Sequence, residues 1–129
     1  MKNQIPEITE ILRPFSEFAF LLGSYGTERF GIDSDIDLAV FFNKSVDQKK
    51  HGELFFTLED LTGRSIDLID LRNIDPIFSR QVLETGRLLL DQNHQRLVEW
   101  QNLQIGKYLD FKMDRLGIEK NLLKRKHHD

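Results

Sequence analysis

Hydrophobic residues recur along the first third of the chain with two different periods, which predict a helix followed by two strands. Apolar positions three and four apart predict a short amphipathic helix over residues 6–13, which Pro14 ends. Residues 17–22 and 36–42 are nearly continuous apolar runs of strand length. We expect the second run to be a central strand, covered on both faces. Between the two runs, residues 23–34 contain three glycines and no periodicity, which predicts a loop.

The alternation continues through the middle of the chain. Residues 46–62 have apolar positions on one side of a helix, and Gly63 stands where a C-cap glycine belongs. Residues 65–71 alternate between apolar and polar positions, as a strand does. A short helix is expected from Pro76 to about Thr85, followed by a last short strand over residues 87–90.

From about residue 94 onward the pattern is helical. Gly106 and Gly117 weaken this helix and mark the places where it would break into two. The apolar positions of the stretch fall on roughly one stripe, made of Ile105, Leu109, Met113, Leu116 and Leu123. We expect its aromatic residues to pack between helices rather than stack on bases, namely Trp100, Tyr108 and Phe111. The pattern as a whole predicts one α+β domain, with a core unit at residues 1–93 and a helical extension at residues 94–129.

Composition narrows the class of protein. The 129 residues include no cysteine, which excludes a disulfide scaffold and a thiolate zinc site. No apolar run approaches membrane-spanning length and no signal peptide is evident, so a cytoplasmic protein is expected. The net charge of −3 argues against direct nucleic-acid binding. Residues 112–129 nevertheless carry six Lys/Arg against three Asp/Glu, so a basic tail follows an acidic body.

One constellation of residues carries a specific chemistry. Gly23-Ser24 is followed by ten residues and then by Asp35-Ile36-Asp37. Residues two apart on a strand project from the same face, so Asp35 and Asp37 point together. Paired carboxylates repel each other unless a cation compensates, and magnesium prefers such oxygen ligands. A Gly-Ser pair at a strand end lets the backbone approach a phosphate while the hydroxyl donates to it. Together they indicate a triphosphate site beside a metal.

The run LLGSYGTERFGIDSDIDLAVFF resembles the motif of the DNA polymerase β-like nucleotidyltransferases, and in particular of their minimal nucleotidyltransferase group. The Gly-Ser pair, the ten-residue gap and the Asp-x-Asp pair match that family's spacing, and the resemblance covers roughly residues 15–90. It implies a polymerase β-like palm, a mixed twisted sheet with helices packed on it. Many relatives have a basic residue and a glycine where this chain has Thr27 and Glu28, and Arg29 is the candidate replacement for the basic group.

The resemblance also implies a mechanism, in-line attack on the α-phosphate of ATP with pyrophosphate as leaving group. Asp35 and Asp37 would hold two Mg²⁺ ions, while Ser24 and the backbone at Gly23 would hold the outer phosphates. The family has a third carboxylate on a later strand, which ligates the second ion and receives or orients the proton. Asp67 and Asp70 have opposite strand parity, so at most one faces the site. The family pattern selects Asp67, with Asp70 as the fallback.

Three functions are compatible with this family. The first is an antitoxin that transfers AMP from ATP to a tyrosine of an all-helical HEPN ribonuclease toxin, and the short chain favours it. The second is nucleotidyl transfer to a small molecule such as an aminoglycoside, which would require a larger helical domain or a partner subunit. The third is a non-catalytic antitoxin that blocks its partner by contact alone, a role that needs no paired carboxylates.

Overall fold

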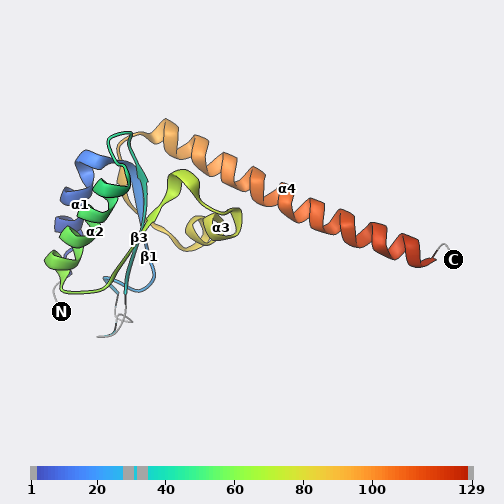
Figure 1. Ribbon diagram of the computed structural model, residues 1–129, viewed down its shortest axis with the longest axis horizontal. Coiled ribbons are helices and arrows are strands. Elements are labelled where there is room, and N and C mark those ends of the chain that lie inside the picture. The colour runs from blue at the N-terminus through green and yellow to red at the C-terminus, as the bar shows by residue number, and fades with distance from the viewer. Residues whose placement is uncertain (1–2, 28–30, 32–34, 128–129) are drawn as a thin grey trace.

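The chain folds as a four-stranded sheet with helices on both faces (Figure 1). The computed structural model describes residues 3–27, 31 and 35–127, with side chains as far as residue 114. The elements, in chain order, are α1 (Ile5–Leu12), the 3₁₀ turn η1 (Arg13–Phe15), β1 (Ser16–Leu22), β2 (Ile36–Phe42), α2 (Gln48–Thr62), β3 (Ile66–Asp70), the 3₁₀ turn η2 (Leu71–Asn73), α3 (Pro76–Thr85), β4 (Arg87–Asp91) and α4 (His94–His127).

The sheet is mixed, as expected, and its strand order is β3-β2-β1-β4. Strand β1 pairs antiparallel with β2 and with β4, whereas β2 and β3 run parallel. Strand β2 is therefore internal, and Leu38, Ala39 and Val40 are all buried, which confirms the prediction of a central strand covered on both faces. The order also places the end of β1 and the starts of β2 and β3 along one edge of the sheet.

Two hydrophobic cores lie on opposite faces of this sheet. On one face, α1 and α2 pack over a cluster that includes Leu12, Leu21 and Leu58. On the other face, a second cluster includes Phe18 and Val82, and α3 lies over it beside α4 (Figure 1). Because side chains alternate along a strand, the first residues of β2 and β3 point in turn to the face under α1 and α2 and to the face under α3. The residues that face α3 line the candidate site.

Two element ends show how side chains set helix limits. Helix α2 begins at Gln48, two residues later than expected, because the Asp47 carboxylate accepts a hydrogen bond from the Lys50 amide at 2.8 Å and caps the helix. The helix ends at Gly63, whose φ of 65° is the left-handed conformation expected of a C-cap glycine. Helix α3 has the limits that the sequence predicted.

Helix α4 is one continuous helix that projects away from the body (Figure 1). The expected break at Gly106 or Gly117 is wrong: each glycine costs about 1 kcal/mol of helix propensity relative to alanine, yet it keeps its place in the backbone ladder. The first turns dock on the body through Leu97 and Trp100, and the Trp100 indole donates to the Leu71 carbonyl at 3.2 Å. Phe111 is 47% exposed, so the residues whose side chains the structure describes do not give it the expected packing.

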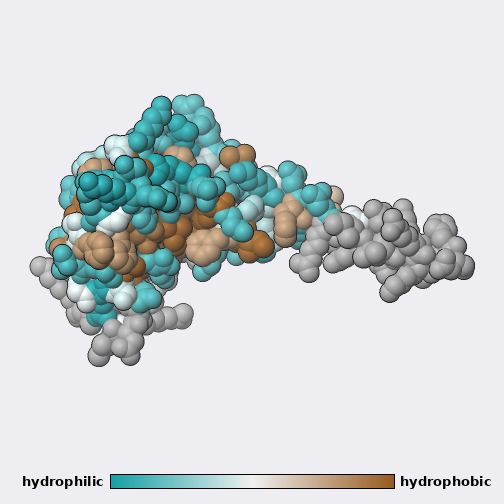
Figure 2. Space-filling model, viewed as in Figure 1, coloured by the Kyte–Doolittle hydropathy of each residue, from teal (hydrophilic) through white to brown (hydrophobic). Residues whose placement is uncertain are grey.

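Tyr108 has a contact with the body, since its ring lies 4.7 Å from the Arg80 guanidinium, which also donates to its hydroxyl. Figure 2 shows hydrophobic surface gathered where the body meets the first half of α4. Among the described helices, none combines the length and the apolar character that crossing a bilayer requires.

Candidate active site

The Gly23-Ser24 pair lies directly beside the second carboxylate of the Asp-x-Asp motif. Leu22, the last residue of β1, pairs with Asp37 on β2. Gly23 follows with φ 69°, a conformation that residues with a side chain rarely adopt. A Cβ at Gly23 would stand 3.1 Å from Oδ2 of Asp37. Glycine is therefore required here for two reasons, the backbone conformation and the close approach of the carboxylate.

The turn after Gly23 is held by hydrogen bonds on both sides. The Ser24 carbonyl accepts from the Thr27 amide at 3.0 Å and from its hydroxyl at 2.6 Å. Tyr25 is buried, and its hydroxyl accepts from the Gln4 amide at 2.7 Å, which ties the turn to the start of α1. The backbone that would face a phosphate is consequently fixed before any ligand arrives. Arg29, the basic residue proposed for this loop, lies outside the described residues.

A basic residue that the sequence did not indicate supports the same turn. Arg87, the first residue of β4, donates from Nη2 to the Gly23 carbonyl at 3.1 Å and to the Tyr25 carbonyl at 2.6 Å. Arg64, just before β3, donates from Nη1 to the Gly31 carbonyl at 3.1 Å. No local pattern could have revealed these contacts, because they connect segments that only strand pairing brings together.

Three carboxylates form one electrostatic group: Asp37 on β2, Asp67 on β3, and Asp35, which lies just before β2. Asp37 and Asp67 are register partners in the parallel β2–β3 pair, so their side chains emerge on the same face. Asp35 stands two residues before Asp37. Burial raises the pKa of Asp37, and the charges of Asp67 and of Asp35 raise it further. The structure thus brings together the three acids that the sequence predicted, around the half-buried Asp37.

Asp70 is engaged elsewhere. Its carboxylate pairs with Arg72 at 2.8 Å and accepts from the Arg72 backbone amide at 3.0 Å, which starts the turn η2. Arg72 in turn donates to the Val46 carbonyl at 2.8 Å. Asp70 is the last residue of β3, three residues after Asp67, and its register partner on β2 is Val40 rather than Asp37. Of the two candidates, only Asp67 stands beside Asp37.

The donor chemistry of this group fits magnesium. In the part of the chain that the structure describes, no three His, Cys, Asp or Glu side chains converge closely enough to hold an ion by themselves. Magnesium commonly binds through one or two carboxylates and completes its shell with water and substrate phosphates. Asp35, Asp37 and Asp67 supply oxygen ligands of this kind, and the repulsion that raises the pKa of Asp37 is what a bound cation would relieve.

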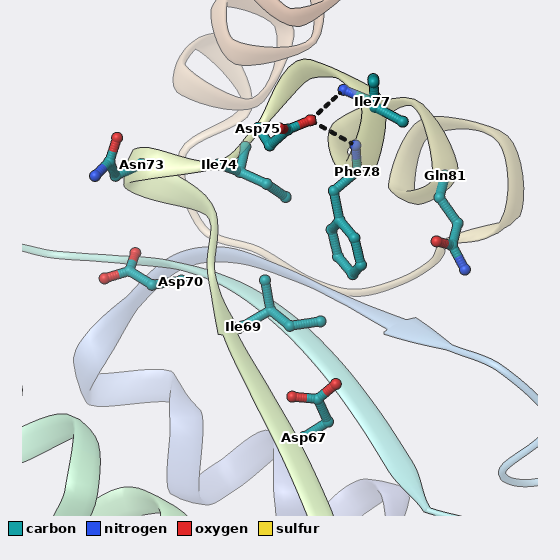
Figure 3. Close-up of a pocket in the computed structure, with 9 residues that line it drawn as sticks. All are labelled: Asp67, Ile69, Asp70, Asn73, Ile74, Asp75, Ile77, Phe78 and Gln81. Carbon is teal, nitrogen blue, oxygen red and sulfur yellow. Dashed lines mark hydrogen bonds between the residues drawn. The ribbon is translucent and has the colours of Figure 1, made fainter.

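A groove of about 670 Å³ opens from Asp67 between β3 and α3 (Figure 3). Its walls are Ile69 of β3 and Phe78 of α3, whose ring points down into the groove toward Asp67 (Figure 3). Asp75 closes the far end, where its carboxylate accepts from the amides of Ile77 at 2.7 Å and Phe78 at 3.4 Å. The described residues that line the groove are Asp67, Ile69, Asp70, Asn73, Ile74, Asp75, Ile77, Phe78 and Gln81.

The chain is similar to proteins of one family and to several solved structures. The chain matches the family described as polymerase beta, nucleotidyltransferase, over residues 6–95. The protein adenylyltransferase MntA of Shewanella oneidensis is 31% identical over 88 residues, which are 68% of this chain and 63% of that protein. The match therefore spans just under two thirds of the length of that curated relative.

Solved structures resemble the chain over nearly its full length. A chain of a toxin–antitoxin complex with AMP-PNP is 25% identical and superposes with a TM-score of 0.76, covering 93% of this chain and 98% of that one. A chain from the complex of the tri-AMPylated Shewanella oneidensis HEPN toxin with MNT antitoxin is 26% identical and superposes with a TM-score of 0.71. The match covers 92% of this chain and 95% of that one. The family match over residues 6–95 shows that this chain, with its mixed sheet, its Gly23-Ser24 turn and its neighbouring carboxylates, belongs to the polymerase β nucleotidyltransferase family.

Proposed function

We propose that the chain is a magnesium-dependent protein adenylyltransferase, an antitoxin that transfers AMP from ATP to a tyrosine of a HEPN-type toxin and so neutralises it. The observation that carries the proposal is the position of Asp37, which interacts with the charges of both Asp67 and Asp35 and lies against the Gly23 turn. A phosphate-binding turn and a group of metal-binding carboxylates are then adjacent, as nucleotidyl transfer requires. The relatives support the choice of donor and acceptor: one is a protein adenylyltransferase, and others are complexes with AMP-PNP or with an AMPylated toxin.

In this proposal the Gly23 turn binds the outer phosphates of ATP. Backbone amides in a fixed turn, with the Ser24 hydroxyl, donate to phosphate oxygens without reorganising when the ligand arrives. The guanidinium of Arg87 donates to the carbonyls of Gly23 and Tyr25 and so supports the backbone of the turn. Arg87 is thus a positioning residue.

The carboxylates act at the α-phosphate. Asp35 and Asp37, with Asp67, would hold magnesium, which when bound neutralises phosphate charge and lowers the pKa of the attacking hydroxyl. Asp67 accepts or orients the proton of the acceptor hydroxyl. A bond forms from the acceptor oxygen to the α-phosphorus, the bond from that phosphorus to the pyrophosphate oxygen breaks, and pyrophosphate leaves.

The partner surface proposed for this antitoxin includes the middle of α4 (His94–His127). Ile105, Leu109 and Met113 lie on one stripe and are 46%, 51% and 66% exposed. Large apolar side chains gathered on an exposed helix are typical of a protein-binding surface. The basic residues that follow on α4 would add an electrostatic contribution, which salt weakens.

The proposal is tested by the mass of the partner. The chain is co-expressed with the protein encoded by the neighbouring gene, the pair is purified, and the partner is weighed by intact-protein mass spectrometry. A gain of one or more adenylyl units is expected with the native chain and with the control Asp60→Ala, which removes an exposed carboxylate of α2 on the other face of the sheet. The gain is expected to vanish with Asp35→Ala. A stable complex whose partner never gains mass would instead indicate inhibition by contact.

A further inference from the structure

The Gly23 turn, Asp37 and Asp67 follow one another across the sheet, from β1 through β2 to β3. Leu22, Asp37 and Asp67 are successive register partners on β1, β2 and β3, so they form a row across three adjacent strands. Neighbouring strands lie about 4.8 Å apart, which places Asp67 roughly 10 Å from the turn that follows Leu22. Under the proposed function, pyrophosphate leaves toward the turn. In-line displacement requires the attacking oxygen on the opposite side of the α-phosphorus, which is the side of Asp67.

The groove between β3 and α3 begins at that side. Asp67 forms one end of it, and the space continues along Ile69 and under the ring of Phe78 (Figure 3). Phe78 is 37% exposed, so a ligand could cover its ring without unfolding α3. A space of about 670 Å³ is large enough for an aromatic side chain together with the backbone that carries it.

The charge of the groove selects among possible occupants. The described residues that line it include three carboxylates and neither lysine nor arginine. Asp70 is paired with Arg72, and Asp75 caps α3, so the groove beyond Asp67 presents apolar walls with the amides of Asn73 and Gln81 near them. A polyphosphate would be repelled by such a surface, whereas a neutral aromatic ring with one hydroxyl would not.

We propose that the groove between β3 and α3 is the acceptor site, in which the phenol ring of a partner's tyrosine lies between Ile69 and Phe78 with its hydroxyl at Asp67. This inference rests on the proposed function and adds the residues that determine acceptor specificity. The tyrosine hydroxyl gives its proton to Asp67 as its oxygen bonds to the α-phosphorus and pyrophosphate departs. An aliphatic hydroxyl reaches the same carboxylate without filling the groove, so Phe78 makes the site selective for tyrosine.

The test separates binding of the acceptor from binding of the nucleotide. Phe78→Ala is compared with Phe56→Ala, the same change on α2 at a side chain that is 65% exposed and remote from the groove. With the neighbouring-gene protein as acceptor, Phe78→Ala is expected to raise the acceptor KM about tenfold, a loss of about 1.4 kcal/mol. The affinity for AMP-PNP with Mg²⁺, measured by calorimetry, is expected to stay unchanged, and so is the melting temperature.

A second arm measures selectivity. The acceptor tyrosine is located by mass spectrometry and replaced by serine. The ratio of the transfer rate to tyrosine over that to serine is expected to be smaller for Phe78→Ala than for the native chain. Weakened AMP-PNP binding in Phe78→Ala would place the nucleobase in the groove and overturn the proposal. An unchanged acceptor KM would overturn it as well. Absence of transfer by the native chain would refute the proposed function itself, an outcome distinct from either of these.

Discussion

The close approach of Gly23 to Asp37 gives a prediction whose size follows from the structure. Gly23→Ala forces a side chain into φ 69°, at a cost of about 1–2 kcal/mol for a left-handed conformation. Its Cβ would also stand 3.1 Å from Asp37 Oδ2, so the carboxylate must turn aside. The first effect alone lowers the melting temperature by roughly 3–10 °C in a domain of this size. The second displaces a proposed metal ligand and is expected to reduce AMP transfer about ten- to a hundredfold.

Gly63 provides the matched control. Its φ is 65°, close to that of Gly23, and a Cβ there would meet nothing within 4 Å. Gly63→Ala is therefore expected to lower the melting temperature similarly while leaving transfer within about twofold of the native rate. Thermal unfolding and the rate of AMP transfer are measured for both variants. Equal transfer rates in the two would refute the reasoning, because the contact with Asp37 is what distinguishes them.

Three further predictions concern the carboxylates. The pKa of Asp37 is higher in the folded chain than in the unfolded chain, so the unfolded chain loses this proton first as pH rises. The free energy of unfolding is therefore expected to fall as pH rises from the usual carboxyl pKa to the raised one. Melting curves recorded without metal are expected to show this fall in the native chain and not in Asp37→Asn. Asp67→Asn is expected to slow AMP transfer far more than Asp70→Asn. Asp70→Asn is instead expected to lower the melting temperature, because it disrupts the pair with Arg72. A slower transfer rate in Asp70→Asn than in Asp67→Asn would mean that Asp70 acts at the site. Mg²⁺ and AMP-PNP together are expected to raise the melting temperature more than the sum of their separate effects, and Asp35→Ala is expected to abolish that excess.

Local patterns predicted most of the fold. The limits of β2 and α3 and the C-cap at Gly63 follow from periodicity and from the conformations of proline and glycine, which act within a few residues. The parity of Asp67 against Asp70 could be derived in the same way, because alternation along a strand is a local property. The structure places Asp67, the acid that the family pattern selected, in register with Asp37, and its role as third carboxylate remains a prediction.

What the sequence did not predict depends on contacts between distant segments. Arg87 reaches the Gly23 turn only because β4 pairs with β1, and Arg64 reaches Gly31 from the start of β3. The groove depends on how α3 packs against β3 after the turn η2, and no period along the chain encodes that packing. The continuity of α4 through Gly106 was missed because helix propensity is a weak preference, which a long hydrogen-bonded ladder overrides.

The central claim is that the chain transfers the adenylyl group of ATP to a partner protein through Asp35 and Asp37. It is tested most directly with ATP carrying a radioactive label on either the α- or the γ-phosphate, incubated with Mg²⁺, the native chain and the neighbouring-gene protein. The label is expected on the partner from α-labelled ATP, and not from γ-labelled ATP. It is expected to be lost when Asp35→Ala and Asp37→Ala are combined. Incorporation of the γ-label, or of the α-label by the double variant, would contradict the account.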